Sequence, residues 1–179
     1  VQGHLLPELS PRHEIVFIDP RVADYQTLLA GASPTLTIVV LDANQDGIEQ
    51  IAAALAKQGP LDAIHILSHG NAAQVSLGTT LLTHTNMDLY ANTLAQWGAA
   101  LNKEGDILLY GCDVGAGAEG AAFVAQLAHI TGADVAASED LTGAVNRGGD
   151  WVLERATGSI ETAIPFTPVA EAGYKGLLA

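Results

Sequence analysis

Two runs of sequence, Ala63-Ile-His-Ile-Leu-Ser-His-Gly-Asn71 and Asp106-Ile-Leu-Leu-Tyr-Gly-Cys-Asp-Val-Gly115, decide the fold of this chain. In each, a mostly apolar run too continuous for a half-exposed strand is followed by a polar turn that contains glycine. Such runs are typical of strands buried inside a parallel sheet. The sequence therefore predicts two core strands, and the turns that follow them carry His69 and Cys112.

The rest of the chain alternates between short β-branched runs and segments with helical spacing. Strands are predicted over 14–19, 35–41, 61–68, 106–110 and 133–138, helices over 46–58, 86–101 and 119–132, and small hairpins over 75–83 and 151–161. Asp46 is expected to cap the first helix, Leu89 to be buried in the second, and Gly132 to end the third. Strands separated by helices predict βαβ crossovers, so we expect one doubly wound α/β domain whose mostly parallel sheet is covered on both faces.

The chain, at 179 residues, is long enough for one domain with a sizeable core. We expect an N-terminal extension over 1–13, the α/β domain over 14–162 and a C-terminal tail or linker over 163–179. Two prolines and the run Glu171-Ala-Gly-Tyr-Lys-Gly-Leu-Leu-Ala179 give this last segment the composition of a tail. Because the chain begins with Val, we expect it to be part of a longer protein.

The charge balance argues against several kinds of partner. Seven Lys and Arg against 20 Asp and Glu give a net charge of −13, which repels nucleic-acid phosphates and anionic membranes. An acidic surface fits a calcium-rich, extracellular setting. No apolar run reaches the roughly 18 residues of a membrane span, and the first residues lack the pattern of a signal peptide. No feature of the sequence indicates an oligomeric state.

His69 and Cys112 are expected to meet at one edge of the sheet. Ligands of open α/β sheets bind at the carboxyl ends of the strands, and neighbouring strands lie about 4.8 Å apart. If the two core strands are neighbours, the Cys112 thiolate could attack a carbonyl carbon while His69 takes and returns a proton. The backbone N–H groups of Gly70 and Cys112 are candidates to bind the oxyanion, because glycine lets the backbone come close to a ligand.

A purely structural explanation of these residues also stays open. Cys112 is the only cysteine, so it forms no internal disulfide, and a single free cysteine is often an inert buried residue. A single histidine at a strand end is often a surface or capping residue. A chemical role is favoured because the same arrangement, an apolar strand and then a reactive residue beside glycine, occurs twice.

The blocks IHILSHG (64–70) and ILLYGCDVG (107–115) resemble the two signature blocks of caspase-like (clan CD) cysteine peptidases. In that group one strand ends in His-Gly, and the next core strand ends in the nucleophilic cysteine. The interval here, 112 − 69 = 43 residues, leaves room for a hairpin and one crossover helix. Almost the whole chain, including LDANQDGIEQIAAAL and DILLYGCDVGAG, more specifically resembles a bacterial domain-of-unknown-function family found near the N-terminus of giant secreted or surface adhesin-like repeat proteins.

This resemblance implies a caspase-like three-layer αβα sandwich with a mostly parallel six-stranded sheet and small hairpins. It implies that His69 is the general base, that Cys112 is the nucleophile, and that Gly70 and Cys112 form the oxyanion hole. It also implies a larger protein that is secreted or lies on the bacterial surface. The sequence differs from caspases at Asn71, where an acid is usual, and at Gly111, where alanine is commoner.

The substrate expected from this resemblance is a polypeptide, first of all the parent chain itself. Three polar residues near strand ends are candidates for the substrate pocket: Asp113, Ser138 and Asp140. An acid there would favour a basic residue before the cut. The end of the chain, Tyr174-Lys-Gly-Leu-Leu-Ala179, is a candidate self-cleavage region, with the cut after Lys175 or after a leucine.

Motifs for metals and cofactors are incomplete, so we expect neither. The run Asp42-Ala-Asn-Gln-Asp-Gly47 copies the first half of a calcium loop, but Ala53 stands where the bidentate glutamate belongs. His65 and His69 are four residues apart on a predicted strand, with no third zinc ligand, and His65 is expected to hydrogen-bond to a neighbour in the sheet. The run GAGAEG (115–120) lacks the lysine of a phosphate-binding loop.

Two hypotheses from different classes remain. The first is a cysteine endopeptidase domain that processes its parent protein or a nearby protein after export, with Cys112 and His69 as its dyad. The second is a non-catalytic module that folds, anchors or binds within a giant adhesin-like protein. One fold hosts many functions, so the fold class alone does not choose between them.

Overall fold

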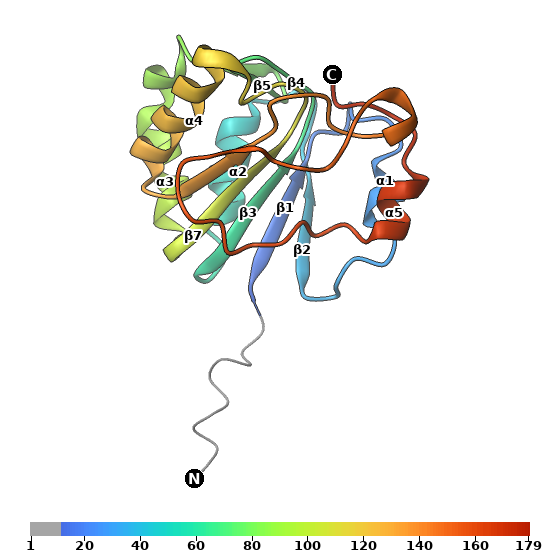
Figure 1. Ribbon diagram of the computed structural model, residues 1–179. Helices are drawn as coiled ribbons and strands as arrows, with labels where there is room; N and C mark the ends of the chain where they lie inside the picture. The colour runs from blue at the N-terminus through green and yellow to red at the C-terminus, as the bar shows by residue number, and fades with distance from the viewer. Residues whose placement is uncertain (1–11) are drawn as a thin grey trace.

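The computed structural model describes residues 12–179 and contains one six-stranded sheet in the order β2-β1-β3-β7-β8-β9. Its strands are β1 (Glu14–Ile18), β2 (Leu36–Val40), β3 (Leu61–Leu67), β7 (Leu101–Tyr110), β8 (Asp134–Ala137) and β9 (Arg155–Ala156). All neighbouring strands pair in parallel except β9, which is antiparallel to β8. The predicted α/β fold with a mostly parallel six-stranded sheet is confirmed (Figure 1).

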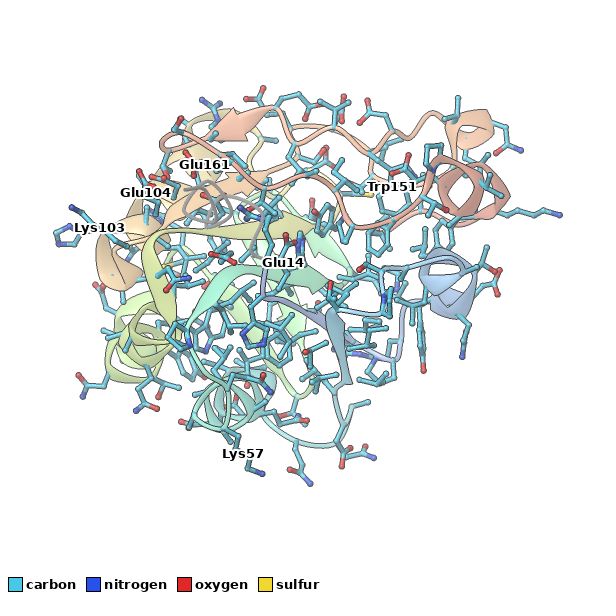
Figure 2. The ribbon with its side chains drawn as sticks, turned by 90° about the horizontal axis from the view of Figure 1, so that it is seen from below. Glu14, Lys57, Lys103, Glu104, Trp151 and Glu161 are labelled. Carbon is cyan, nitrogen blue, oxygen red and sulfur yellow. The ribbon has the colours of Figure 1, made fainter. Side chains whose placement is uncertain are left out.

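Helices cover both faces of this sheet. The three longest, α2 (Gly47–Leu55), α3 (Ala91–Ala99) and α4 (Gly117–Thr131), lie on one face, and α1 (Tyr25–Leu29) and α5 (Pro168–Gly173) lie on the other (Figure 1). Each face has its own buried apolar cluster. Figure 2 shows Trp151 beside α5 on one side of the sheet. Lys57, which follows α2, lies on the opposite side. No helix within residues 12–179 is long and apolar enough to cross a membrane.

The helix ends follow the local rules read from the sequence. The Asp46 carboxylate accepts the backbone N–H groups of Ile48 at 2.8 Å and Glu49 at 3.4 Å, so it caps α2 as predicted. Gly132 ends α4 with φ of 75°, a left-handed conformation that glycine adopts without a steric cost.

A small antiparallel sheet extends the turn after β3. It consists of β4 (Gly70–Asn71), β5 (Gln74–Leu77) and β6 (Thr80–Thr83). The predicted hairpin over 75–83 is confirmed, and it turns at Gly78, where φ is 61°. Because β4 begins at Gly70, this sheet is continuous with the loop that carries His69.

The predicted helix over 86–101 is divided differently. A 3-10 turn, η3 (Met87–Tyr90), precedes α3, and β7 already begins at Leu101. Leu89 is 84% exposed, so the prediction that it is buried is wrong. The reason is geometric: a 3-10 turn has about three residues per turn, so the buried face that holds Leu94 and Trp97 does not extend back to Leu89.

The predicted terminal hairpin over 151–161 is also wrong. Only β9 is a strand, and it pairs with β8 instead of with a neighbouring part of the same segment. Thr157 continues this pairing, because its N–H donates to the Val135 carbonyl at 3.0 Å and its hydroxyl accepts the Val135 N–H at 2.9 Å. These hydrogen bonds are made to β8. The sequence of 151–161 alone does not show that the edge of β8 is available for pairing.

The segment 163–179 is packed, unlike the flexible tail that its composition indicated. Phe166, Tyr174 and Leu178 are buried in the cluster on the α1 side of the sheet. Trp151 lies against two of them, with ring centroids 5.4 Å from Phe166 and 5.9 Å from Tyr174. Pro168 is the first residue of α5 and does not belong to a linker. At the other end, the predicted extension over 1–13 lies outside the described residues except for its last two.

Candidate active site

The two core strands read from the sequence are neighbours. β3 and β7 pair in parallel with Leu67 opposite Tyr110, so their carboxyl ends lie at the same edge of the sheet. Leu67, Tyr110 and Cys112 all belong to the buried cluster on the α1 side. His69 follows two residues after Leu67, in the loop that leaves β3 at this edge.

Glycines let the two strand ends come into contact. A Cβ atom on Gly70 would lie 2.5 Å from Val114 Cγ2 and 3.1 Å from the Cys112 carbonyl oxygen. A Cβ atom on Gly111 would lie 3.0 Å from the Ser68 carbonyl oxygen. These distances leave no room for larger residues without movement, so the glycines beside His69 and Cys112 serve the close approach of the two loops.

Two backbone donors converge on a single oxygen at this edge. The N–H of Gly70 donates to the Leu178 carbonyl oxygen at 2.9 Å, and the N–H of Cys112 donates to the same oxygen at 3.0 Å. Fixed N–H groups that point at one carbonyl oxygen polarise it and stabilise the negative charge that develops there when the carbonyl carbon is attacked. The cradle formed by the Gly70 and Cys112 amides holds a peptide carbonyl of the chain's own C-terminal segment.

That segment lies in an extended conformation beside the loop after β8. Leu178 donates its N–H to the Thr142 carbonyl at 3.0 Å, and Ala144 donates its N–H to the Gly176 carbonyl at 2.8 Å. The bridge between Gly143 and Leu177 is antiparallel. Gly143 has φ of 133°, and a Cβ atom there would lie 2.4 Å from the Gly176 oxygen. The loop is therefore shaped to accept a peptide backbone in the manner of an added strand.

The Cys112 thiol is buried beneath this segment. Its Sγ accepts the Thr142 N–H at 3.2 Å and donates to the Thr142 carbonyl at 3.6 Å. Burial raises the pKa of Cys112, and the negative charges of Asp113 and Asp140 add to this effect, although N–H groups of Thr142 and Leu178 partly oppose it. With the segment in place, the sulfur is held in its protonated form.

His69 is held in one tautomer. Its Nε2 lies 3.1 Å from the Arg21 carbonyl oxygen, which can only accept, so Nε2 carries the proton. In the neutral ring Nδ1 is then the acceptor, and this atom is buried without a hydrogen-bond partner. An unpaired acceptor of this kind is available to take a proton.

Asp19 and Arg21 hold the carbonyl that positions His69. Arg21 donates its backbone N–H and its Nε–H to Asp19 Oδ1 at 2.9 and 2.8 Å, and the Gly78 N–H donates to Asp19 Oδ2 at 2.9 Å. Burial alone would raise the pKa of Asp19, but these hydrogen bonds and the Arg21 charge lower it. Neither residue was among the predicted site residues. The signal was present, because Asp19-Pro-Arg21 follows β1 at the same carboxyl edge.

A cleft of about 310 Å³ opens beside the cradle. His69, Asp113 and Ala179 line it together with Gly70, Asn71, Gln74, Ser76 and Leu81. The imidazole and the thiol share no hydrogen bond, since Nδ1 has no partner and Sγ is paired with Thr142. The Cys112 backbone N–H contacts the Leu178 carbonyl, and Ala179 lines the cleft together with His69, whereas the buried thiol is not part of the cleft lining.

The residues predicted to line a substrate pocket lie mainly against one another. Asp113 donates its N–H to the Asp140 carbonyl at 2.8 Å, and the Ser138 hydroxyl donates to Asp140 Oδ1 at 3.1 Å. Asp113 has φ of 60°, which turns the chain sharply after Cys112. Oxygens of Asp140, Asp150 and Glu154 lie within 4.8 Å of one another and could hold a cation, although exposed carboxylates often gather in this way without one.

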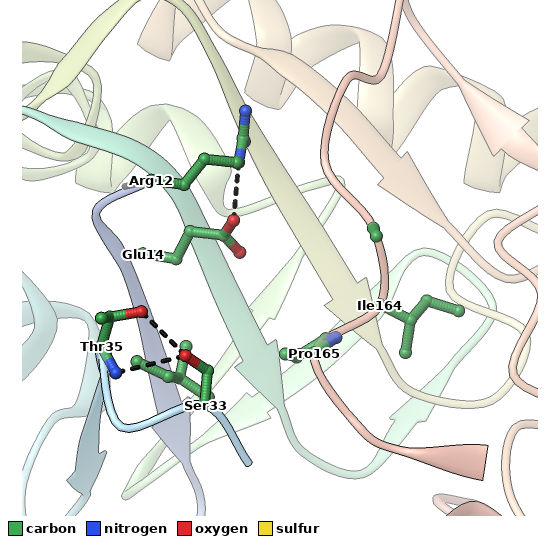
Figure 3. A pocket seen from close by; sticks show the side chains of 8 residues that line it. Arg12, Glu14, Ser33, Thr35, Ile164 and Pro165 are labelled. Carbon is green, nitrogen blue, oxygen red and sulfur yellow. Dashed lines mark hydrogen bonds and ion pairs between the residues drawn. The ribbon is translucent and has the colours of Figure 1, made fainter. Parts of the chain in front are cut away.

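A second cavity of about 310 Å³ lies near the start of β1, far along the strands from the cradle (Figure 3). Its Glu14 pairs with Arg12 and accepts from His65 Nε2 at 2.7 Å, and His65 Nδ1 lies 2.9 Å from the Tyr110 hydroxyl. Burial alone would raise the pKa of Glu14, but the hydrogen bonds and charges of His65 and Arg12 lower it. The prediction that His65 is hydrogen-bonded within the sheet is confirmed.

A family model described as "Domain of unknown function (DUF4347)" matches residues 15–178. A comparison with curated protein sequences gave no match. Among solved structures, the chain is similar to one titled "Crystal structure of a small-chain dehydrogenase", with 13% sequence identity over 67% of this chain and 68% of that chain and a TM-score of 0.32. A likeness at that score supports no argument about fold or function.

Proposed function

The chain belongs to the family described as "Domain of unknown function (DUF4347)", and from that premise we propose that it is a caspase-like cysteine endopeptidase domain that cleaves its own parent protein. Its nucleophile is Cys112 and its general base is His69. The domain acts as part of a larger protein that is secreted or displayed on the bacterial surface. It requires no cofactor for the chemical step.

The single observation that carries this proposal is the convergence of the Gly70 and Cys112 N–H groups on one peptide carbonyl oxygen. Buried peptide carbonyls usually find partners in helices, sheets or turns. Here both donors come from loops that also carry an imidazole and the only thiol of the chain. A structural role for Cys112 does not require a histidine with an unpaired ring nitrogen in the cleft that Ala179 also lines.

The reaction follows from these positions. His69 Nδ1 takes the proton of the Cys112 thiol, and Sγ forms a bond to the carbonyl carbon held in the cradle. Negative charge moves to the carbonyl oxygen, where the Gly70 and Cys112 amides stabilise it. The C–N bond breaks as His69 gives its proton to the leaving amine. Water then attacks the thioester, which yields a carboxylate and restores the thiol.

The substrate of this reaction is a polypeptide in an extended conformation. The antiparallel hydrogen bonds between residues 142–144 and 176–178 support this, because they are made to backbone atoms of any sequence. The net charge of −13 supports a role away from nucleic acids and anionic membranes. Burial beneath the segment raises the pKa of Cys112, so the reaction needs His69 to take the thiol proton.

A second candidate, a non-catalytic binding or anchoring module, is favoured by one observation. The only described segment in the groove is the chain's own, and it leaves the thiol protonated and buried. In this alternative the groove stabilises the fold of the C-terminal segment, and Cys112 fills space as a small apolar residue.

The experiment that separates the two uses the full chain fused through Ala179 to a stable reporter domain. Release of the reporter is followed on gels for the unchanged chain, Cys112→Ala and His69→Ala, with and without calcium. The endopeptidase predicts release by the unchanged chain and none by either variant. Equal band patterns for all three proteins under all conditions would leave the binding module as the function.

A further inference from the structure

We infer that the bond this domain cuts is Leu178–Ala179 and that it selects substrates with a leucine before the cut, in an extended segment. The inference rests on the proposed peptidase function and names its substrate. It narrows the possibilities that the sequence left open, which were a cut after Lys175 or after either of two leucines.

The residue whose carbonyl oxygen accepts the two amide hydrogen bonds identifies the peptide bond that is cleaved. In attack on a peptide, the carbonyl whose oxygen becomes the oxyanion belongs to the residue before the cut. Leu178 supplies that oxygen, at 2.9 and 3.0 Å from the two amide nitrogens. Ala179 follows in the cleft that His69 lines, so the leaving amine, the Ala179 nitrogen, is on the side of the imidazole. Lys175 is exposed, three residues away from the cradled carbonyl.

The side chain of Leu178 occupies an apolar site. It is fully buried in the same cluster as Cys112, Trp151 and Tyr174, whereas Leu177 is only partly buried. A charged side chain at this position would lose its hydration and find no ionic partner in the apolar cluster, so its burial there is strongly unfavourable. The site therefore takes leucine or a similar apolar side chain and rejects lysine, which is opposite to the basic preference expected from the acids near the strand ends.

Gly176, two residues before Leu178, packs closely within the segment itself. A Cβ atom at this position would lie 2.8 Å from the Tyr174 hydroxyl oxygen. On the facing loop, Gly143 leaves space for the Gly176 carbonyl, 2.4 Å from where a Cβ atom would stand. Because Tyr174 belongs to the same segment, the loop recognises position 176 through its backbone carbonyl, and the side chain of Leu178 carries the selectivity.

The balanced step on this bond is a hydrolysis. Cys112 Sγ bonds to the Leu178 carbonyl carbon, the bond to the Ala179 nitrogen breaks, and the thiol proton ends on that nitrogen by way of His69. One water then cleaves the thioester, so Leu178 becomes a C-terminal carboxylate and Cys112 is a thiol again. No oxidant, metal or second substrate takes part.

The test is to identify the new chain ends in the reporter fusion by intact mass and by sequencing the released fragment. The expected fragment begins at Ala179. Leu178→Lys is expected to slow release by about 100-fold or more, and Leu178→Met, which stays apolar, by no more than about tenfold. Lys175→Ala is the matched control, since this exposed residue contacts neither the cradle nor the cleft, and its release rate should equal that of the unchanged chain.

The outcomes separate the inference from the function on which it rests. Release that requires Cys112 but begins at another residue, or that proceeds equally fast in Leu178→Lys, overturns the inference and leaves a peptidase. Absence of any release that depends on Cys112 overturns both. Circular dichroism of Leu178→Lys checks folding, and if this variant is unfolded the comparison passes to Leu178→Asn and Leu178→Met, which must differ by about tenfold or more.

Discussion

Replacing Leu178 with alanine is expected to expose the Cys112 thiol to alkylation. In the structure the Leu178 side chain is fully buried, and its backbone N–H and carbonyl hold the extended segment against Thr142, Gly70 and Cys112. The substitution keeps those backbone hydrogen bonds and removes only the apolar anchor. It therefore raises the fraction of molecules in which the segment has opened and the sulfur meets solvent.

The magnitude follows from the burial. Truncating a fully buried leucine to alanine removes about 2 to 5 kcal/mol of stability, and each 1.4 kcal/mol is about a tenfold change in an equilibrium constant. If alkylation occurs from the open state, Leu178→Ala is expected to react at least about 30-fold faster than the unchanged chain. Leu177→Ala is the matched variant, and because Leu177 is only partly buried we expect no more than about a fivefold increase.

The assay is alkylation by iodoacetamide under native conditions, followed by intact mass, with urea titrations to show that both variants stay folded. The pH dependence adds a second readout. Burial raises the pKa of Cys112, so the labelling rate of the unchanged chain should rise only above the ordinary thiol range, and Leu178→Ala should move this rise to lower pH. Equal rates for Leu178→Ala and Leu177→Ala would refute the claim that Leu178 anchors the cover over the thiol.

Three further predictions concern the supports of the site. Asp19→Asn is expected to slow reporter release by about tenfold, because it loosens Arg21 and with it His69. It should also weaken the dependence of the free energy of unfolding on pH in acid. The pKa of Asp19 is lowered, so the stability its carboxylate contributes is present above the unfolded pKa, about 3.9, and is lost as the pH falls below that value, which urea melts against pH can measure. Nitrogen-15 NMR of the neutral His69 ring should show the proton on Nε2, and a proton on Nδ1 would contradict the assignment of the base. Gly98→Ala, whose Cβ would lie 1.8 Å from the Thr131 carbonyl oxygen, should lower stability by about 1 to 3 kcal/mol in urea melts while release per folded molecule stays the same.

The core of the fold could be predicted from the sequence because its signals are local. Continuous β-branched and apolar runs identified the parallel strands, and single residues such as Asp46, Gly78 and Gly132 identified a cap, a turn and a helix end. The hairpin predicted over 151–161 is wrong because the strand partner is distant in sequence. Residues 155–157 pair with β8 rather than with their own neighbours.

The site was predictable to a smaller extent. The neighbouring strands β3 and β7 and their glycines were readable, because parallel core strands must end at a common edge. The role of the last residues was not. Composition indicated a tail, whereas Tyr174 and Leu178 are buried. Residues typical of a loop separate the two, so no helical or strand periodicity predicts their burial. The position of Arg21 after β1 was readable, but its role was not, because it acts through its backbone carbonyl, which every residue has.

Trapping of the acyl intermediate tests the central claim, that the Cys112 sulfur attacks the carbonyl held by the Gly70 and Cys112 amides. The reporter fusion is allowed to react in neutral hydroxylamine, which converts a thioester to a hydroxamate, and the new C-terminus is identified by mass. The account predicts a hydroxamate on Leu178 that is absent in Cys112→Ala. A fusion that is never cut, or that yields only the carboxylate at every hydroxylamine concentration, would contradict it.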